Sequence, residues 1–261
     1  MGAREVKKTA VITGGAGGLG QALSEALREQ GWHTVIIDLP GPRLDALVDE
    51  KDLSLYACDL TKPKQCADVC AQILKERPSI DMVIYNAGVT QISAFADSDL
   101  NSHRDLFEIN YFSAVECARH FLFALRKSKG THLAISSVAG FAPLFHRTAY
   151  AASKHAMEGF FKSLRAEETH HGVSVTIAAP SFVATNIGQT ERDAKGFARP
   201  GSATDGVDYM TPQDAAQIIL RGCQNRKAFV PVGRVATLSN AMNRLAPSLF
   251  FRQMMRTIGR S

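Results

Sequence analysis

Short apolar runs alternate with longer amphipathic segments along most of this chain of 261 residues. The apolar runs, rich in Val, Ile and Leu, are 9–13, 34–37, 53–57, 82–85, 132–136, 173–178 and 228–231. Helical spacing is found between them, near 18–30, 41–50, 63–76, 101–127, 149–170 and 212–224. Apolar strands that are separated by helices indicate a parallel sheet covered on both faces. We therefore expect one doubly wound α/β domain over residues 1–261, with a mostly parallel seven-stranded sheet.

Two stretches break this alternation. Residues 181–211 contain scattered glycines and charges without a clear period. A loop of that length within a compact domain is usually a functional lid, so we expect a substrate lid over 181–211. After the last apolar run, we expect residues 234–261 to form a helical extension.

Composition narrows the class of protein. With 45% hydrophobic and 21% charged residues, the chain resembles an ordinary globular protein rather than a disordered or collagen-like one. Its five cysteines include no CxxC pair and no accompanying histidine cluster. We interpret them as small buried side chains in a reduced, intracellular setting, with no metal site. The sequence shows no apolar leader and no membrane-spanning run, which predicts a soluble, cytoplasmic protein.

A glycine-rich turn follows the first apolar run, where residues 13–20 read Thr-Gly-Gly-Ala-Gly-Gly-Leu-Gly. Such a turn lets the backbone approach a pyrophosphate, which the free N–H groups of the following helix would bind. Because the turn lies between a strand and a helix, as a dinucleotide-binding motif requires, we assign it to cofactor binding. Two registers fit, GxGxxG from Gly15 and TGxxxGxG from Thr13. The candidate cofactor contacts are Gly14, Gly17, Gly18, Leu19 and Gly20.

Asp38 ends the second apolar run. A carboxylate at that position can accept hydrogen bonds from the hydroxyls of the adenosine ribose and repels a 2′-phosphate. No Lys or Arg occurs in the glycine-rich turn or directly after Asp38. The sequence therefore favours NAD over NADP as the cofactor.

Tyr150 and Lys154 are four residues apart at the start of a predicted helix, and this spacing places them on one face. A phenol has an ordinary pKa near 10, too high for acid/base work at neutral pH. A neighbouring ammonium group favours the phenolate and lowers that pKa. Ser137 follows the fifth apolar run and completes a candidate catalytic set.

These motifs together resemble the short-chain dehydrogenase/reductase family. TGxxxGxG, Asn86-Ala87-Gly88, Asn110, Ser137 and YxxxK occur in the order and spacing of that family, over about residues 8–231. The resemblance implies a Rossmann-like fold and hydride transfer between NAD(H) and a secondary alcohol or ketone. It implies that Tyr150 donates a proton to the substrate carbonyl or accepts one from the alcohol. It implies that Lys154 lowers the pKa of Tyr150 and holds the nicotinamide ribose. It further implies that Ser137 binds the reacting oxygen and that Asn110 holds a water.

The resemblance also implies further cofactor contacts: Asp59, Leu60, Asn86, Ala87, Gly88, Tyr150, Lys154, Pro180, Val183 and Thr185. Two positions depart from the family pattern. Tyr85 stands where an Asn is usual, and Ser181 stands where a Gly usually follows the Pro. We expect the Ser181 side chain to narrow the pocket beside the nicotinamide.

The substrate is indicated only as a class. Apolar side chains flank the catalytic residues, and the candidates for the pocket are Phe141, Leu144, Phe145, His146, Phe182 and Ile187. Residues 150–185 loosely resemble the steroid- and retinoid-active branch of the family, so we expect a bulky, apolar, steroid-, retinoid- or lipid-like substrate. The alternative is a catalytically silent member that binds NAD(H) as a sensor or scaffold.

Small residues at helical spacing predict a contact with another subunit. They form a stripe on the helix that carries Tyr150, and they are Ala152, Ala156, Gly159, Ser163 and Ala166. Small side chains allow close approach of two helices, so we expect a homo-oligomer, either a dimer or a tetramer.

The end of the chain is basic. Residues 215–261 contain no Asp or Glu but carry Arg221, Arg226, Lys227, Arg234, Arg244, Arg252, Arg256 and Arg260. This stretch has no nucleic-acid-binding motif, so we expect no nucleic-acid partner. Phe251, Met255 and Ile258 share a helical stripe beside these arginines, as in a helix that lies at a membrane surface. The alternative, which we favour from the sequence, is that the stripe caps the substrate pocket or a neighbouring subunit.

Overall fold

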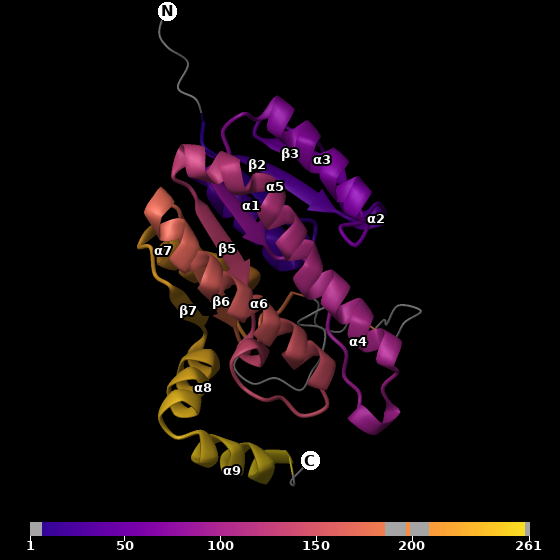
Figure 1. Ribbon diagram of the computed structural model, residues 1–261, viewed down its shortest axis with the longest axis vertical. Helices are drawn as coiled ribbons and strands as arrows, with labels where there is room; N and C mark the ends of the chain where they lie inside the picture. The colour runs from indigo at the N-terminus through magenta and orange to yellow at the C-terminus, as the bar shows by residue number, and fades with distance from the viewer. Residues whose placement is uncertain (1–6, 186–196, 199–208, 259–261) are drawn as a thin grey trace, which may run out of the picture.

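A sheet of seven strands forms the centre of the molecule, in the order β3-β2-β1-β4-β5-β6-β7 (Figure 1). The computed structural model describes residues 7–185, 197–198 and 209–258. The strands are β1 (Thr9–Thr13), β2 (His33–Asp38), β3 (Leu53–Ala57), β4 (Met82–Tyr85), β5 (Thr131–Ile135), β6 (Ser174–Pro180) and β7 (Phe229–Val232). All six pairings between these strands are parallel. The expected doubly wound α/β fold is confirmed, and the described sheet is parallel throughout.

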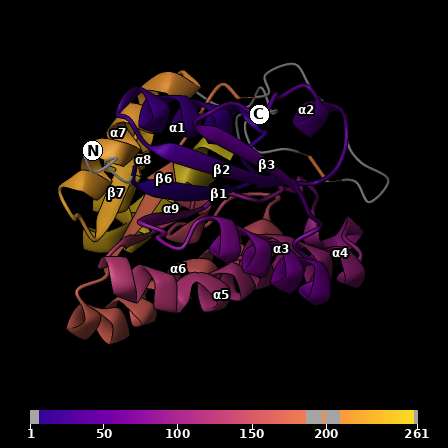
Figure 2. The ribbon, with the colours of Figure 1, turned by 90° about the horizontal axis from the view of Figure 1, so that it is seen from above.

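Helices cover both faces of the sheet (Figure 2). On one face lie α1 (Gly18–Glu29) and α7 (Pro212–Gln224), whose apolar side chains pack on β1, β4 and β6. On the other face lie α3 (Pro63–Glu76), α5 (Ser113–Ser128) and α6 (Thr148–Glu168). Burial on both faces explains why the strands read as continuous apolar runs rather than alternating ones.

The sheet has a switch point between β1 and β4, because the chain winds outward in opposite directions from these two neighbours. In open sheets of this kind, ligands bind in the crevice beyond the carboxyl ends of the strands at that point. The glycine-rich turn follows β1, and the Asn86 segment follows β4. The topology therefore brings both segments to one edge of the sheet.

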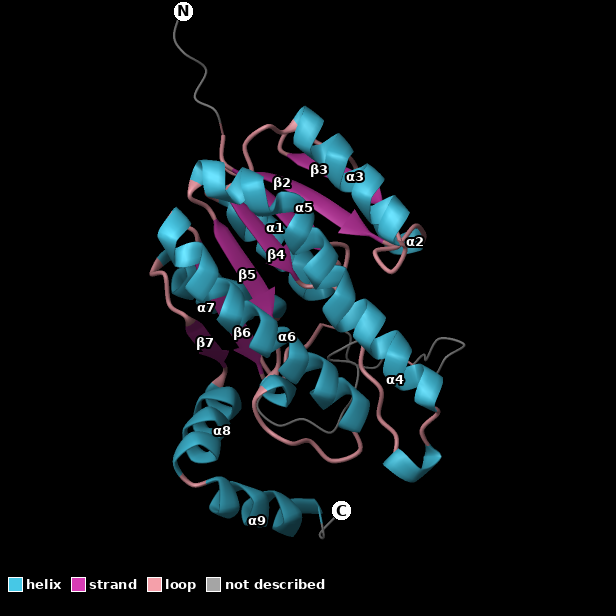
Figure 3. Cartoon of the chain, viewed as in Figure 1, coloured by secondary structure: helices cyan, strands magenta, loops and turns pink. Residues whose placement is uncertain are grey.

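Two predicted helices differ from the observed ones (Figure 3). The helix expected over 41–50 is only one turn, α2 (Pro42–Asp45), and the Asp49 carboxylate instead accepts a hydrogen bond from the Leu55 N–H at 2.8 Å. The helix expected over 101–127 is α4 (Leu100–Phe107), a π-helical turn η2 (Glu108–Phe112) and α5. Short 3₁₀ turns are η1 (Phe95–Asp97), η3 (Val138–Gly140) and η4 (Thr169–His171).

The expected C-terminal extension is helical and consists of two helices, α8 (Arg234–Leu245) and α9 (Pro247–Ile258). They separate at Ala246, which has a φ of −146° and a ψ of 63°. The residue before a proline is disfavoured in the helical region, so Pro247 ends one helix and begins the next. No helix within the described ranges is long and apolar enough to cross a membrane.

Of the expected lid over 181–211, residues 186–196 and 199–208 lie outside the described residues. One described part is held against the body of the protein, and the two ends of the segment are held together. Thr90 and Ala198 exchange backbone hydrogen bonds of 2.7 and 2.8 Å, and Val183 forms an isolated bridge with Met210. The interpretation of this segment as a lid stays a prediction.

Candidate active site

The glycine-rich turn requires glycine at two positions for steric reasons. Gly14 has a φ of +63°, and a Cβ atom there would lie 2.7 Å from the Ala87 Cα. A Cβ atom on Gly20 would lie 2.5 Å from the Gly14 carbonyl oxygen. The first turn of α1 therefore packs directly on the loop, and its free N–H groups face the crevice.

Asp38 lies at the end of β2 and is bound to the same turn. Its Oδ2 atom accepts a hydrogen bond from the Ala16 N–H at 2.8 Å, and its Oδ1 atom accepts one from the Leu39 N–H at 2.8 Å. A carboxylate can accept about four hydrogen bonds, so capacity for a ribose hydroxyl remains. Arg43 of α2 also lines the cavity, and the sequence interpretation missed it because only the residues directly after Asp38 were considered.

Asn86 and the residues after it form the middle of the site. The Asn86 side-chain amide donates to the Gly14 carbonyl at 2.8 Å. The N–H groups of Asn86 and Ala87 both donate to the Thr13 hydroxyl, at 3.1 and 3.2 Å. These bonds fix the loop after β4 against the glycine-rich turn.

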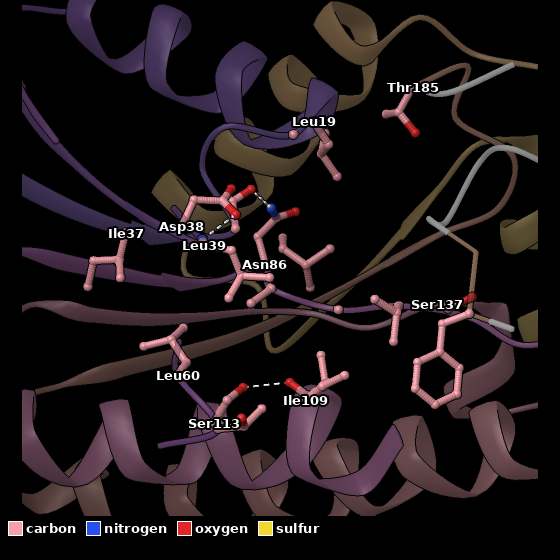
Figure 4. Close-up of a pocket in the computed structure, with 18 of the residues that line it drawn as sticks. Leu19, Ile37, Asp38, Leu39, Leu60, Asn86, Ile109, Ser113, Ser137 and Thr185 are labelled. Carbon is pink, nitrogen blue, oxygen red and sulfur yellow. Dashed lines mark hydrogen bonds between the residues drawn. The ribbon is translucent and has the colours of Figure 1, made fainter. Parts of the chain in front are cut away.

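A cavity of about 670 Å³ runs along this edge of the sheet. In Figure 4, Asp38 and Ser137 lie toward opposite ends and Asn86 lies between them. The sequence-predicted cofactor residues that line the cavity are Gly14, Gly17, Gly18, Leu19, Asp38, Asp59, Leu60, Asn86, Ala87, Gly88, Tyr150, Lys154, Pro180, Val183 and Thr185. Gly20 does not line it, because this residue packs beneath the turn. A cavity of this size and shape can hold an extended dinucleotide with a small part of a substrate.

Tyr150 and Ser137 meet at one end of the cavity. Tyr150 is buried near the start of α6, and Ser137 precedes η3. The two hydroxyls are hydrogen-bonded, and burial raises the pKa of the Tyr150 phenol while the bond with Ser137 and the charge of Arg147 oppose the rise. Two hydroxyls so placed can bind the same substrate oxygen.

Lys154 is buried one helical turn beyond Tyr150. Its Nζ atom donates to the Ile135 carbonyl at 2.9 Å. Burial lowers the pKa of Lys154 to about 8, and the nearby Glu158 carboxylate opposes this decrease. The ammonium group is thus held beneath the Asn86–Gly88 segment, within 3.5 Å of the point where a Gly88 Cβ would lie.

Glu158 is a buried residue beside the site that the sequence interpretation missed. Its carboxylate is buried, with 1% of its side chain exposed, and its Oε1 atom accepts a hydrogen bond from the Ser136 hydroxyl at 2.8 Å. Its Oε2 atom pairs with Lys162 Nζ at 2.6 Å. Glu158 therefore joins α6 to the residue next to Ser137 and places a negative charge one turn from Lys154. An acid four residues from two lysines would have indicated only a surface pair.

Asn110 lies at the centre of the π-helical turn and is fully buried. Its side chain exchanges two hydrogen bonds with the Val89 backbone, at 2.9 and 3.0 Å, and donates to the Ser153 hydroxyl at 3.0 Å. Asn110 thus joins the loop after β4 to α6. It does not line the cavity, and its expected role in holding a water stays a prediction. Single π-helical turns often mark functional positions in helices.

The two departures from the family pattern have structural explanations. The Tyr85 hydroxyl lies 2.6 Å from His132 Nδ1, and the ring of Tyr85 is buried in the core. Tyr85 therefore replaces a polar residue without entering the cavity. Ser181 lines the cavity, but its hydroxyl donates to the Val232 carbonyl at 3.2 Å and is bound to β7.

The expected apolar pocket residues lie elsewhere. Among the described ones, Phe141 packs with Val138, Ala142 and Ala236, Phe182 contacts Tyr209, and none lines the large cavity. Leu144, Phe145 and His146 line a second, separate groove. Ile187 lies outside the described residues. The apolar wall of the large cavity is instead formed by Val89, Ile109, Phe197 and Ala198.

The fold also brings three cysteines together. Cys66 and Cys70 of α3 meet Cys117 of α5, and the three sulfur atoms lie within 4.8 Å of one another. The sequence interpretation had found no neighbouring ligand for the first two. All three thiols are buried in the core and all five cysteines are free; the expectation that they hold no metal stays a prediction.

The fold and the site define a class of protein: a Rossmann-like dinucleotide-binding oxidoreductase. A family model described as short chain dehydrogenase matches residues 8–196. The match covers most of the chain, so the protein belongs to the short-chain dehydrogenase/reductase family.

Relatives support this assignment. Dehydrogenase/reductase SDR family member 7B of Xenopus laevis is 32% identical over 257 residues, covering 94% of this chain and 80% of the relative. The Bos taurus protein of the same name is 31% identical, covering 94% of this chain and 79% of its own length. A short-chain dehydrogenase from Burkholderia cenocepacia J2315, solved in complex with NADP, has a TM-score of 0.82 at 22% identity. That likeness covers 95% of this chain and 97% of the other, and at this identity it supports the fold alone.

Proposed function

We propose that the protein transfers a hydride between NAD(H) and a secondary alcohol or ketone, with Tyr150 as its proton donor and acceptor. The observation that carries this proposal is the meeting of Tyr150, Ser137 and Lys154 at one end of a cavity whose other end holds Asp38. This arrangement places proton-transfer groups where the nicotinamide of an extended dinucleotide would lie.

Each residue of the set has a distinct role in the proposed reaction. During reduction, Tyr150 donates its proton to the carbonyl oxygen while the Ser137 hydroxyl donates a hydrogen bond to the same atom. As the family resemblance implies, the Lys154 ammonium would lower the pKa of Tyr150 further when cofactor is bound, in addition to the Ser137 hydrogen bond and the Arg147 charge. Bound nicotinamide would supply or accept the hydride at the substrate carbon. In the opposite direction, the Tyr150 phenolate accepts the alcohol proton.

The cofactor preference rests on Asp38. Its carboxylate lies at the adenosine end of the cavity and would repel a 2′-phosphate. Arg43 and Lys62 line the same cavity, and their positive charges would favour NADP, the ligand of the solved Burkholderia structure. We favour NAD(H), because two backbone N–H groups fix the Asp38 carboxylate beside the glycine-rich turn, where it would accept hydrogen bonds from the ribose and repel a 2′-phosphate.

The Asp38→Ala variant tests this preference. We expect the ratio of kcat/KM for NADH over NADPH to fall by roughly tenfold, about 1.4 kcal/mol, because the repelling carboxylate is removed. The control is Asp45→Ala, which removes an exposed carboxylate from α2. A wild-type enzyme that uses NADPH as well as NADH would contradict the assignment of Asp38.

The substrate class and assembly are further parts of the proposal. A bulky, apolar, steroid-, retinoid- or lipid-like substrate is supported by the apolar wall that Phe197, Val89 and Ile109 provide beside the catalytic end. A homo-oligomer is supported by the exposed small residues of α6. A cytoplasmic location is supported by the five free thiols.

A panel of secondary alcohols and ketones, assayed with both NAD(H) and NADP(H), tests the activity itself. We expect turnover to increase with the apolar bulk of the substrate. The alternative of a silent NAD(H)-binding sensor predicts tight NADH binding without turnover of any member of the panel.

A further inference from the structure

Helix α9 lies at the end of the molecule with little of its surface covered (Figure 1). Of the side chains described from Pro247 to Arg256, only Phe250 and Met254 are partly buried. Phe250 packs against the small cluster of Val138, Ala142 and Ala236. The helix is thus attached along one edge and leaves both an apolar and a basic side free.

The apolar side of α9 borders a groove of about 320 Å³. The groove is lined by Phe95, Pro143, Leu144, Phe145, His146, Thr148, Phe251, Met254 and Met255. Several of these side chains are open to solvent, with 70% of Phe95, 48% of Phe145 and 52% of Phe251 exposed. Contiguous exposed aromatic and aliphatic side chains of this kind mark interaction sites.

The side of α9 next to the groove is positively charged. Arg252 and Arg256 are exposed one helical turn apart, and no described carboxylate pairs with either. The chain has no Asp or Glu after Asp214, so α8 and α9 offer no internal neutralisation. Exposed apolar side chains beside unpaired arginines are complementary to a partner that has negative charges at its surface and an apolar layer beneath them.

We propose that α9 and the rims of this groove dock on an anionic lipid bilayer, with Phe95, Phe145, Phe251 and Met255 entering the interface. The two arginines would then lie at the level of the headgroups. This is the arrangement of interfacial amphipathic helices, in which apolar burial and attraction to anionic lipid act together.

A second copy of the chain fits this surface less well. A two-fold contact that pairs α9 with its own equivalent would bring Arg252 and Arg256 against the same two arginines, with no acid of α8 or α9 between them, and the repulsion would oppose it. A two-fold contact that pairs α9 with another part of the chain is distinguished by the oligomer size of the α9 variants described below. The charge distribution therefore favours the bilayer.

Docking would also bring part of the chain between the catalytic residues near the lipid. Most of the groove residues belong to the segment between Ser137 and Tyr150. Docking would therefore bring the loop between Ser137 and Tyr150 close to the bilayer, while the groove and the large cavity are separate. The catalytic role of these two residues rests on the proposed function, whereas the docking itself does not.

Vesicle co-sedimentation of the full-length protein tests the docking without any measurement of turnover. Vesicles of phosphatidylcholine with phosphatidylserine are compared with vesicles of phosphatidylcholine alone. We expect binding to the anionic vesicles at low salt, weaker binding at physiological salt and much weaker binding to the neutral vesicles, because surface charges are screened within about 8 Å at physiological salt. Each basic residue near an anionic surface contributes roughly fivefold in partitioning.

Two double variants separate the charged from the apolar contribution. Arg252→Gln with Arg256→Gln should weaken partitioning roughly 25-fold, and Phe251→Ser with Met255→Ser should weaken it on both vesicle types. Arg226→Gln with Lys227→Gln is the charge-matched control, because these exposed residues precede β7 at the opposite end of that strand from α8. Val48→Ser is the apolar control, since Val48 is 72% exposed between α2 and β3, away from the groove.

Circular dichroism and NADH binding should be unchanged in all variants, because the substituted side chains are exposed. Protein that stays in the supernatant with both vesicle types at low salt would overturn the proposal. So would equal binding of the α9 double variants and the wild type. A reduction in oligomer size by the α9 variants, without vesicle binding by the wild type, would assign the surface to a second copy instead.

Discussion

Glu158 is the residue whose importance depends most on the fold. The sequence places it four residues after Lys154, but only the packing of α6 on η3 brings its carboxylate to Ser136. A buried carboxylate is costly unless it is paired and hydrogen-bonded, and Glu158 satisfies both oxygens with Ser136 and Lys162. The residue therefore both positions the Ser137 segment and sets the charge around Lys154.

Glu158→Gln should change the pH dependence of the reaction. Burial lowers the pKa of Lys154 to about 8 and Glu158 opposes that effect, so the loss of its charge lowers the pKa of Lys154 further. Lys154 would then lose its proton, and its help to Tyr150, at a lower pH. We expect the alkaline decline of kcat/KM for ketone reduction to move to lower pH.

The amide of Gln can still accept the Ser136 hydrogen bond, so the variant separates charge from geometry. Glu167→Gln is the matched control, because Glu167 is exposed on the same helix. An alkaline limb at the same pH in wild type and Glu158→Gln would show that Glu158 has only a structural role.

At the scale of elements, α5 and α6 are joined by an ion pair at their ends. Arg126 Nη2 lies 2.7 Å from Glu168 Oε1, and Arg126 Nε donates to Oε2 at 3.0 Å. The Glu168 side chain is fully buried, whereas 28% of the Arg126 side chain is exposed. Removal of one partner would leave a buried carboxylate without compensation.

Arg126→Ala should therefore lower the free energy of unfolding by about 3–5 kcal/mol at neutral pH, measured by urea denaturation. The hydrogen bond from Arg126 holds the pKa of Glu168 below its ordinary value of 4.5. The contribution of the pair is thus present above pH 4.5 and is lost as the pH falls below the lowered pKa. The difference between wild type and variant should shrink in acid. A loss below about 1 kcal/mol at neutral pH would place the pair among weak surface interactions.

The strands could be predicted from the sequence because burial on both faces demands continuous apolar runs. Helix ends were less predictable. The helix expected over 41–50 ends after one turn, and Asp49 beyond it accepts a hydrogen bond from the Leu55 N–H. The helix expected over 101–127 is interrupted at Asn110 by a π-helical turn. Neither event leaves a periodic signal, because each depends on a partner brought by tertiary structure.

Some residues of the candidate site could likewise be predicted from the sequence, whereas others depend on tertiary structure. Tyr150, Lys154, Ser137 and the glycine-rich turn were identified from their spacing together with the family resemblance, and the fold brings them to one cavity. Phe197 and Arg43 were not, since the first reaches the cavity through the pairing of Ala198 with Thr90. Leu144, Phe145 and His146 had been expected in the substrate pocket, but they line a separate groove together with residues of α9.

At the scale of the whole molecule, α5 and α6 present an open face beside each other (Figure 2). Ala152, Gly159, Ser163 and Ala166 are exposed on α6, and a Cβ atom on Gly159 would meet no other atom within 4 Å. We expect this face to contact a second subunit, because small residues allow close helix approach.

Gly159→Arg should therefore dissociate the oligomer without disturbing the fold of the single chain, since nothing within the subunit would clash. Light scattering at micromolar concentration gives the mass of each protein. Gln217→Arg is the control for an added charge, because Gln217 is exposed on α7, which packs on the opposite face of the sheet from α6. A monomeric wild type, or a Gly159→Arg variant of unchanged mass, would refute the predicted interface.

The central claim is that this protein is an enzyme whose proton transfer depends on one phenol. Tyr150→Phe removes only that hydroxyl, and general acid–base catalysis contributes roughly 10²–10⁴-fold, so kcat should fall by about that factor. NADH binding, followed by nicotinamide fluorescence, should be unchanged. Tyr56→Phe is the control, because the Tyr56 hydroxyl donates to Glu76 outside the cavity. Turnover by Tyr150→Phe within about tenfold of the wild type would contradict the account.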